Sequence, residues 1–431
     1  MSSPHEETTL PNLEALEARL VAAAKLLVDL GAALHWSALP ASVVEMRVRG
    51  VARALGVRAD IFVLQGFLCL ETEGAPVERV ELRRIDFDTH WNVRRVHELY
   101  DLCTSLVAGE RGVTTGREEL DRILAEPRRY KKWLVVIAYG VYGLAVAARV
   151  GGGALEALAG AIIGVVAGVI HYATIRYKRI DLQKSFLGAL VGTLVAFALR
   201  AVLPPFDVGR ALFGGITLLV PAMVLTIGTY ELANDALESG VARLAYALLR
   251  FLMLGFGIAV AMRLFPLVAP LPSRVISSPL PHLVTLLLVA VGGGALTFCL
   301  QGRRRDLPWM AVAALFAFGV QELTKLIFGG RGSPMLSALL LGVAANLYAR
   351  LTDKIPATFV IPGLLQLAPG FLGTEAVFNL LAGAGGANLD QARLFDVFMT
   401  ALQLVTGLLL ADVFAGGAVR RRFHRAPAPS H

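Results

Sequence analysis

Several motifs that carry common enzymatic chemistry are missing from this sequence. No segment fits GxxxxGK(S/T), the phosphate-binding loop with which many proteins hydrolyse ATP. The patterns HExxH and GxSxG and any cluster of cysteine and histidine ligands are missing too, which argues against the common metal-dependent and serine hydrolases. Cys69, Cys103 and Cys299 are scattered and odd in number, so we expect free thiols. The sequence therefore predicts a protein that is not an enzyme and needs neither a cofactor nor a metal.

Charged residues are scarce in most of the chain. They make up 17% of the sequence against 56% hydrophobic residues, and the mean hydropathy of +0.63 is well above that of soluble proteins. Residues 1–132 hold 18 Lys or Arg and 20 Asp or Glu, whereas the remainder holds 23 and 13. We therefore predict a membrane protein whose polar N-terminal domain, without a signal peptide, ends near Tyr130. Because the net charge of +8 arises in the membrane part, we expect contact with anionic lipid and no nucleic acid.

Beyond Tyr130 the sequence contains apolar runs of the length that a lipid bilayer requires. A window of about 19 residues finds ten of them. They cover residues 132–150, 154–174, 184–203, 208–228, 242–264, 280–299, 308–326, 334–350, 356–374 and 394–414. The sequence therefore predicts an α-helical polytopic membrane protein with ten transmembrane helices.

The basic residues of the loops indicate an orientation, because cationic loops resist translocation. With the N-terminus in the cytoplasm, fourteen Lys or Arg of the loops and tail fall on the inner side and eight on the outer side. Both termini are then cytoplasmic, and the protein is integral to the cell (inner) membrane.

A proline-rich segment divides the predicted spans into two groups of five. The stretch FPLVAPLPSRVISSPLPH, Phe265 to His282, contains repeated prolines that prevent a helix. Because each group has an odd number of spans, two related groups would be inserted in opposite directions, as inverted repeats of secondary transporters are. The predicted organisation is a cytoplasmic domain at 1–130, five-helix units at 131–265 and 282–418, a linker at 266–281 and a basic tail at 419–431.

Helix-breaking residues recur at corresponding places in the two groups. The fourth span contains LLVPAMVLTIG and the ninth FVIPGLLQLAPG, so aligning Pro221 with Pro362 places Gly228 opposite Pro369. A proline inside a helix costs about 3 kcal/mol, and in lipid the freed carbonyl is hard to satisfy. The pattern favours broken helices lining a polar cavity, where carbonyl oxygens meet an ammonium group and helix N-termini meet a carboxylate. The alternative is a plain kink that only shapes packing.

The candidate substrate-binding residues lie at and between these breaks. They are Pro221, Ala222 and Thr226 in the fourth span and Pro362, Gly363, Gln366, Pro369 and Gly370 in the ninth. Among the uncharged polar residues of the spans we favour Gln366, because it lies between two breakers. Its amide either binds a substrate hydroxyl or joins two helices by hydrogen bonds.

The N-terminal domain has the pattern of a small α+β domain. Apolar residues at helical spacing predict helices at 13–34 and 42–55. Alternating and β-branched segments at 59–65, 66–72 and 77–84 predict three strands. Helices resume near His90 and Thr115, the second with a capping-type start.

Long stretches of the chain resemble a known family. They are VARALGVRADIFVLQGFLCLE at 51–71, RRIDFDTHWNVRRVHELYDL at 83–102, LLVPAMVLTIGTYELANDALESGVARLAYALL at 218–249, DLPWMAVAALFAFGVQEL at 306–323 and IPATFVIPGLLQLAPGF at 355–371. With these stretches the chain resembles the threonine/serine exporter family, in which a cytoplasmic domain and five spans precede a smaller five-span unit. The family usually has Pro-Gly at the fourth-span break, where this chain has Ala222 after Pro221, which leaves less room for close backbone approach.

The resemblance implies a secondary active transporter that exports threonine and serine by proton antiport. Three other functions stay open from the residues alone. They are transport of another small metabolite such as a dipeptide or carboxylate, a membrane-anchored sensor or enzyme acting through the N-terminal domain, and a passive channel. The oligomeric state stays open as well, a homo-oligomer included.

A proton-coupled exporter needs a group that changes charge, and ionisable side chains are few in the predicted spans. Glu322 in VQELTK is the first candidate, although an ion pair with Lys325 three residues further on would explain it equally. His171 titrates near neutral pH, but near a span end it also fits a wet interfacial histidine. Asp412 has the same ambiguity.

Polar residues also follow the fourth-span break. Glu231, Asn234 and Asp235 in TYELANDALESG lie at the predicted cytoplasmic mouth. The resemblance aligns the glutamate with an acidic position common in the family, so these residues are candidates for attracting the substrate ammonium group. The alternative is a solvated helix end.

Overall fold

The protein comprises two compact units that interleave along the chain. The computed structural model describes residues 10–73, 79–85, 92–176, 183–269, 277–329, 333–352, 354–367 and 387–415. Among these, the first unit combines Met1–Pro127 with the later segment Tyr230–Ala242, and the second combines Arg128–Thr229 with Arg243–Ala415. The segment Tyr230–Ala242, which the sequence assigned to the first membrane unit, therefore packs with the N-terminal domain.

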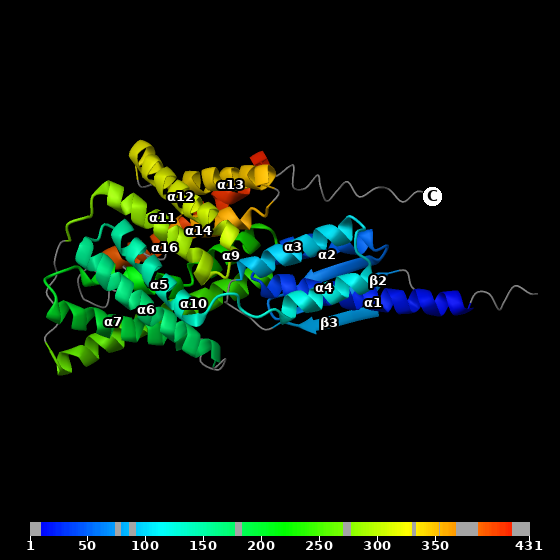
Figure 1. Cartoon of the computed structure of the whole chain (residues 1–431), viewed down its shortest axis with the longest axis horizontal. Helices are drawn as coiled ribbons and strands as arrows, with labels where there is room; N and C mark the ends of the chain where they lie inside the picture. Colours follow the sequence, from blue (N-terminus) through cyan, green and yellow to red (C-terminus); the bar gives the residue numbers. More distant parts are fainter. Residues whose placement is uncertain are drawn as a thin grey trace, which may run out of the picture. The chain divides into compact units, whose positions relative to one another are not determined.

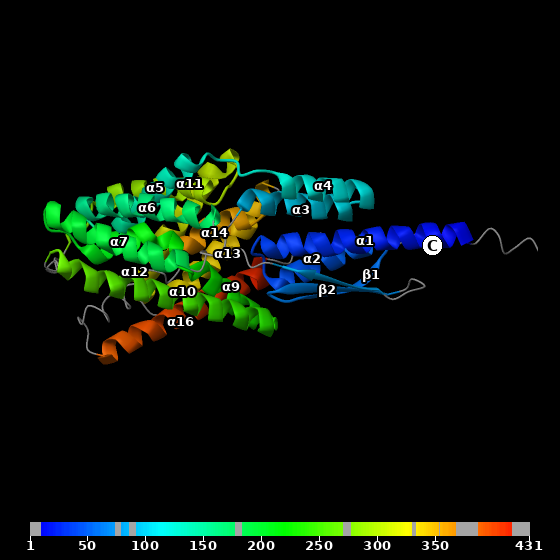
Figure 2. The same cartoon turned by 90° about the horizontal axis from the view of Figure 1, so that it is seen from below.

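The N-terminal domain is a small α+β domain built in layers. Helices α1 (Leu10–Trp36) and α2 (Ala41–Ala54) precede strands β1 (Arg58–Val63), β2 (Phe67–Glu73) and β3 (Arg79–Arg84), and helices α3 (Val93–Val107) and α4 (Val113–Ala125) follow. The strands form an antiparallel sheet in the order β1-β2-β3. Helices α1 and α2 contact the sheet and α3 and α4 pack on them, so that all four helices lie on one side of it (Figures 1 and 2). The predicted helices and strands of this domain are confirmed.

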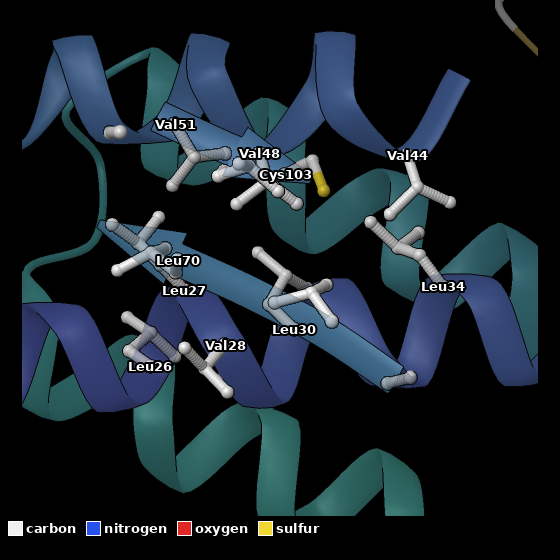
Figure 3. Packing of buried hydrophobic residues seen from close by; sticks show 14 of the residues in the cluster. Leu26, Leu27, Val28, Leu30, Leu34, Val44, Val48, Val51, Leu70 and Cys103 are labelled. Atoms are coloured by element: carbon white, nitrogen blue, oxygen red, sulfur yellow. The ribbon is translucent and has the colours of Figure 1, made fainter. Parts of the chain in front are cut away.

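Apolar periodicity explains this packing. Leu27, Leu30 and Leu34 repeat on one face of α1 and meet Val44 and Val48 of α2, all of them fully buried or nearly so (Figure 3). Burying a side chain of this size stabilises the fold by about 1.5–3 kcal/mol. The face of α1 therefore fixes where the second helix and the sheet can lie.

Cys103 of α3 lies in this core, and its environment predicts a low reactivity. Burial raises the pKa of its thiol from the ordinary 9.0 to about 11, because the core disfavours the thiolate. Stability from this group is therefore present below pH 9 and is lost as the pH rises toward 11. We expect iodoacetamide at pH 8 to modify the partly exposed Cys69 of the folded protein and to reach Cys103 only in denaturant, as peptide mass spectrometry would show. Alkylation of both thiols at equal rates would contradict this.

The second unit is helical. Its helices are α5 (Lys132–Arg149), α6 (Ala154–Arg176), α7 (Gln183–Val202), α8 (Val208–Ile216), α9 (Ala222–Ala233), α10 (Leu237–Leu264), α11 (His282–Cys299), α12 (Leu307–Phe328), α13 (Ser333–Thr352), α14 (Ala357–Leu367) and α16 (Ala387–Ala415). The first residues of α10 and the last of α9 belong to the segment that packs with the N-terminal domain.

Eight helices among the described residues are long and apolar enough to cross a membrane, and α8 with α9 makes a ninth if the bent pair is one span. The ten predicted spans are thus not all found. The predicted ninth span, 356–374, contains α14, whose eleven residues are too short to cross a bilayer. Residues 368–374 of that prediction lie outside the described part of the chain. The chain is a helical membrane protein with a small N-terminal α+β domain.

Candidate functional site

The predicted fourth span is broken. Helix α8 ends at Ile216, a single 3-10 turn covers Thr217–Leu219, and α9 starts at Ala222 after a bend of 57°. Val220 between them is extended, with φ −72° and ψ 131°, as the residue before a proline prefers. The break that Pro221 predicts is therefore present in the structure.

A buried polar network lies at this break. The guanidinium of Arg250 on α10 donates from Nε to the Tyr246 hydroxyl at 2.7 Å and from Nη1 to Oγ of Ser185 at 3.4 Å. Ser185 in turn donates to the carbonyl oxygen of Leu219, the last residue before the break, also at 3.4 Å. Arg250 is 3% exposed and Ser185 fully buried. A positive charge is therefore held inside the helices beside the interrupted backbone.

Arg250 is a residue that the sequence analysis missed. It lies in the middle of the predicted span 242–264, and an arginine at such a place is a signal of function by itself. The two side chains predicted after the break are less suited to contact a ligand. Ala222 and Thr226 are buried, and the Thr226 hydroxyl donates to the carbonyl oxygen of Ala222 in its own helix at 3.0 Å.

Pro362 does not interrupt its helix. It lies inside α14, so the expectation of a break at this proline is wrong for the described residues. At the neighbouring Gly363 the helix lies close to α13, because a Cβ added there would lie 2.7 Å from Cδ2 of Leu341. Such close helix contact can hold a proline-containing turn in place. Pro369 and Gly370 lie outside the described residues.

The end of α14 carries a second polar cluster, which joins α14 to α5. Arg149, the last residue of α5, donates from Nη1 to the backbone oxygen of Gln366 at 2.7 Å. Gln366 is 2% exposed and Tyr142, two turns before Arg149 on α5, is 1% exposed. Oε1 of Gln366, the Tyr142 hydroxyl and Nε of Arg149 are buried without a hydrogen-bond partner among the described residues. Buried polar atoms in native proteins nearly always have partners, so such a cluster is a candidate ligand site.

Glu322 forms the ion pair that its spacing allows. Nζ of Lys325 lies 2.9 Å from Oε1 of Glu322 on α12, and both side chains are nearly half exposed. The carboxylate also interacts electrostatically with Arg149. A proton-coupling role for Glu322 stays a prediction.

The other two predicted proton sites lie on different helices. His171 of α6 is partly buried, with its ring centroid 5.2 Å from that of Tyr139. Asp412 is exposed near the end of α16. Among the described residues no group of three or more His, Cys, Asp or Glu is placed to bind a metal ion.

The three polar residues after the break differ in their exposure. Glu231 is fully buried, and its Oε1 accepts the backbone N–H of Ala41 at the start of α2 at 3.0 Å. It therefore does not end a solvated helix. Asn234 donates to the Tyr230 carbonyl at 2.8 Å, and the exposed Asp235 has a φ of 62°, as at a helix C-terminus.

Fold and site together define a polytopic helical membrane protein that has, within the described residues, a broken span with a buried arginine beside it. Residues 25–265 match the family model described as "Putative threonine/serine exporter", and residues 285–414 match the model described as "Threonine/Serine exporter, ThrE". The first match alone covers more than half of the chain. The chain belongs to the threonine/serine exporter family.

The chain is similar to curated fungal proteins. "Pheromone-regulated membrane protein 10" of Candida glabrata is 22% identical over 358 residues, which cover 79% of this chain and 44% of that protein. The protein of the same name from Saccharomyces cerevisiae S288c is 23% identical over 308 residues, 69% of this chain and 78% of that protein. The chain spans less than half the length of the Candida glabrata relative. No solved structure matches the chain.

Proposed function

We propose that this protein is a secondary active transporter that exports threonine and serine from the cytoplasm. The observation that carries the proposal is the broken fourth span, where the buried guanidinium of Arg250 is linked through Ser185 to the carbonyl oxygen of Leu219 beside the break. Interrupted helices of this kind line substrate sites in secondary transporters. Membership of the threonine/serine exporter family supports the substrate class and a function without a chemical reaction.

The proposed topology has ten spans as two inverted five-helix units in the cell (inner) membrane, with the N-terminal domain and the basic tail in the cytoplasm. The bias of basic residues toward the inner loops supports it. In this topology α8 and α9 form the fourth span, and the ninth span contains α14.

We place the proton-coupling group at His171 first and at Glu322 second. Nζ of Lys325 already occupies Oε1 of Glu322 at 2.9 Å, whereas an unperturbed imidazole titrates in the range of a physiological proton gradient. Asp412, exposed near a helix end, comes third.

The test measures threonine accumulation in sealed proteoliposomes with the membrane potential clamped. A gradient of one pH unit across the membrane is worth about 1.4 kcal/mol per proton. Exchange of one threonine for one proton therefore supports a roughly tenfold ratio of threonine concentrations across the membrane. We expect the wild type to approach this ratio, His171→Gln to equilibrate threonine without accumulation, and Glu322→Gln to behave as the wild type. Loss of accumulation only in Glu322→Gln would move the proton site to that residue. If the wild type equilibrates threonine regardless of the gradient, the protein is a channel. If neither threonine nor serine moves, the substrate is another metabolite.

A further inference from the structure

The guanidinium of Arg149 is only partly used by the protein. Nη1 donates to the Gln366 carbonyl, while Nε is buried and has no partner among the described residues. The opposite edge of the guanidinium, formed by Nε and Nη2, is one of the two forks with which arginine binds a carboxylate through parallel hydrogen bonds. A role in capping the end of α14 explains the bond from Nη1 and leaves this fork unexplained.

The acid that interacts with Arg149 does not fill the fork. Glu322 interacts with it electrostatically, but its Oε1 is bound by Lys325 at 2.9 Å and its side chain is 44% exposed. Arg149 is partly buried with its Nε fully buried, and its nearby acid is engaged elsewhere, so it is suited to an anion that arrives from outside.

The atoms around Arg149 select the rest of such a ligand. Oε1 of Gln366 can only accept a hydrogen bond, and it is buried without a donor among the described residues. The buried Tyr142 hydroxyl can donate or accept. An α-amino acid supplies a partner for the arginine fork and one for Gln366. Its carboxylate fits the fork, and its ammonium group or side-chain hydroxyl can donate to Oε1 of Gln366.

We propose that Arg149 binds the carboxylate of a zwitterionic α-amino acid, with Oε1 of Gln366 accepting a hydrogen bond from its ammonium or hydroxyl group. The proposal rests on the proposed function, since it assigns a substrate-binding residue to the exporter. It places one binding group on α5 of the first half and the other on α14 of the second, so the ligand would bridge the two halves.

The test compares threonine with threoninamide, which has the same side chain and ammonium group but no carboxylate. For the wild type, threonine should inhibit labelled threonine flux and threoninamide should inhibit far less. Arg149→Gln should raise KM roughly tenfold to hundredfold, the loss expected for a charge-assisted fork, and should bind the two ligands equally weakly. Arg149→Lys keeps the charge without the fork and should fall between. Arg263→Gln, an exposed arginine near the end of α10, is the matched control.

A ligand-induced rise in melting temperature separates this proposal from the proposed function. If the wild type moves neither threonine nor serine, the proposed function fails, and all common amino acids and their amides are then tested for stabilisation. The arginine site with another substrate is supported if an amino acid raises the melting temperature of the wild type, its amide does not, and the same amino acid does not stabilise Arg149→Gln. A wild-type KM in Arg149→Gln, equal competition by threoninamide, or no stabilisation by any amino acid overturns it. If Arg149→Gln does not fold, Arg149→Lys carries the same comparison.

Discussion

Replacing Glu231 by alanine is expected to lower the free energy of unfolding by about 2 kcal/mol. The carboxylate is fully buried and accepts the N–H of Ala41, whose helix α2 is preceded by Pro40 and has no side-chain cap of its own. The positive end of the helix dipole also favours a carboxylate here. Without it a buried donor loses its acceptor. Thermal unfolding of the full chain measures the loss, and faster amide exchange at the start of α2 locates it.

Two variants make the Glu231 test specific. Glu231→Gln retains an acceptor oxygen and should recover part of the lost stability. Glu238→Ala removes an exposed acid from the first turn of α10 in the same segment and should change the free energy of unfolding by less than about 0.5 kcal/mol. Equal melting temperatures for Glu231→Ala and Glu238→Ala would show that the buried contact adds nothing to stability.

The Glu231 contact ties the segment after the broken span to the N-terminal domain. Helix α9 begins at the break in the membrane unit, and its last residues belong to the unit of the N-terminal domain. A second bond within that unit, from the Ser239 hydroxyl to the Val63 carbonyl at 3.3 Å, ties the same segment to β1. The half-helix after Pro221 therefore runs directly into a segment that the N-terminal domain holds at two points. We expect Glu231→Ala to alter the transport rate as well as stability.

The parts of the fold that the sequence predicts are those set by a local pattern of apolar residues. The apolar periodicity of 13–34 and the alternation in the three strands fix elements whose partners are close in sequence. The polar bonds at the candidate sites depend on tertiary contacts. Arg149 and Gln366 are 217 residues apart and Glu231 and Ala41 are 190 apart, and no local signal pairs them. Arg250 is different, because a charge in mid-span is visible in the sequence.

Pro221 and Pro362 show that a local pattern alone does not predict a helix break. Both have the local cost that predicts a break. At Pro221 the preceding Val220 is extended and the span bends by 57°, whereas α14 runs through Pro362 against α13. Proline chemistry therefore predicts strain, but it does not by itself decide whether the helix breaks.

Replacing Pro221 by alanine is expected to straighten the fourth span and to slow transport roughly tenfold to hundredfold, the scale of losses from misplaced binding groups. Alanine restores an N–H and frees Val220 from its extended conformation, so α8 and α9 can join into one helix. A straight helix from Val208 to Ala233 would be about 38 Å long. Spin labels at the exposed Pro205 and Ala233 should therefore move apart, and labelled threonine flux should fall.

Pro362→Ala is the matched control, because its helix is already continuous and the distance across the fourth span should stay unchanged. Straightening and slow flux in Pro221→Ala alone would mean that the interrupted backbone beside Arg250 takes part in transport. Straightening with wild-type flux would show that the break only shapes packing, and the role of the broken span in export would then have to be abandoned. The Leu219 carbonyl oxygen is linked to Arg250 through the Ser185 hydroxyl. If this link positions the positive charge, Ser185→Ala should slow flux without straightening the span.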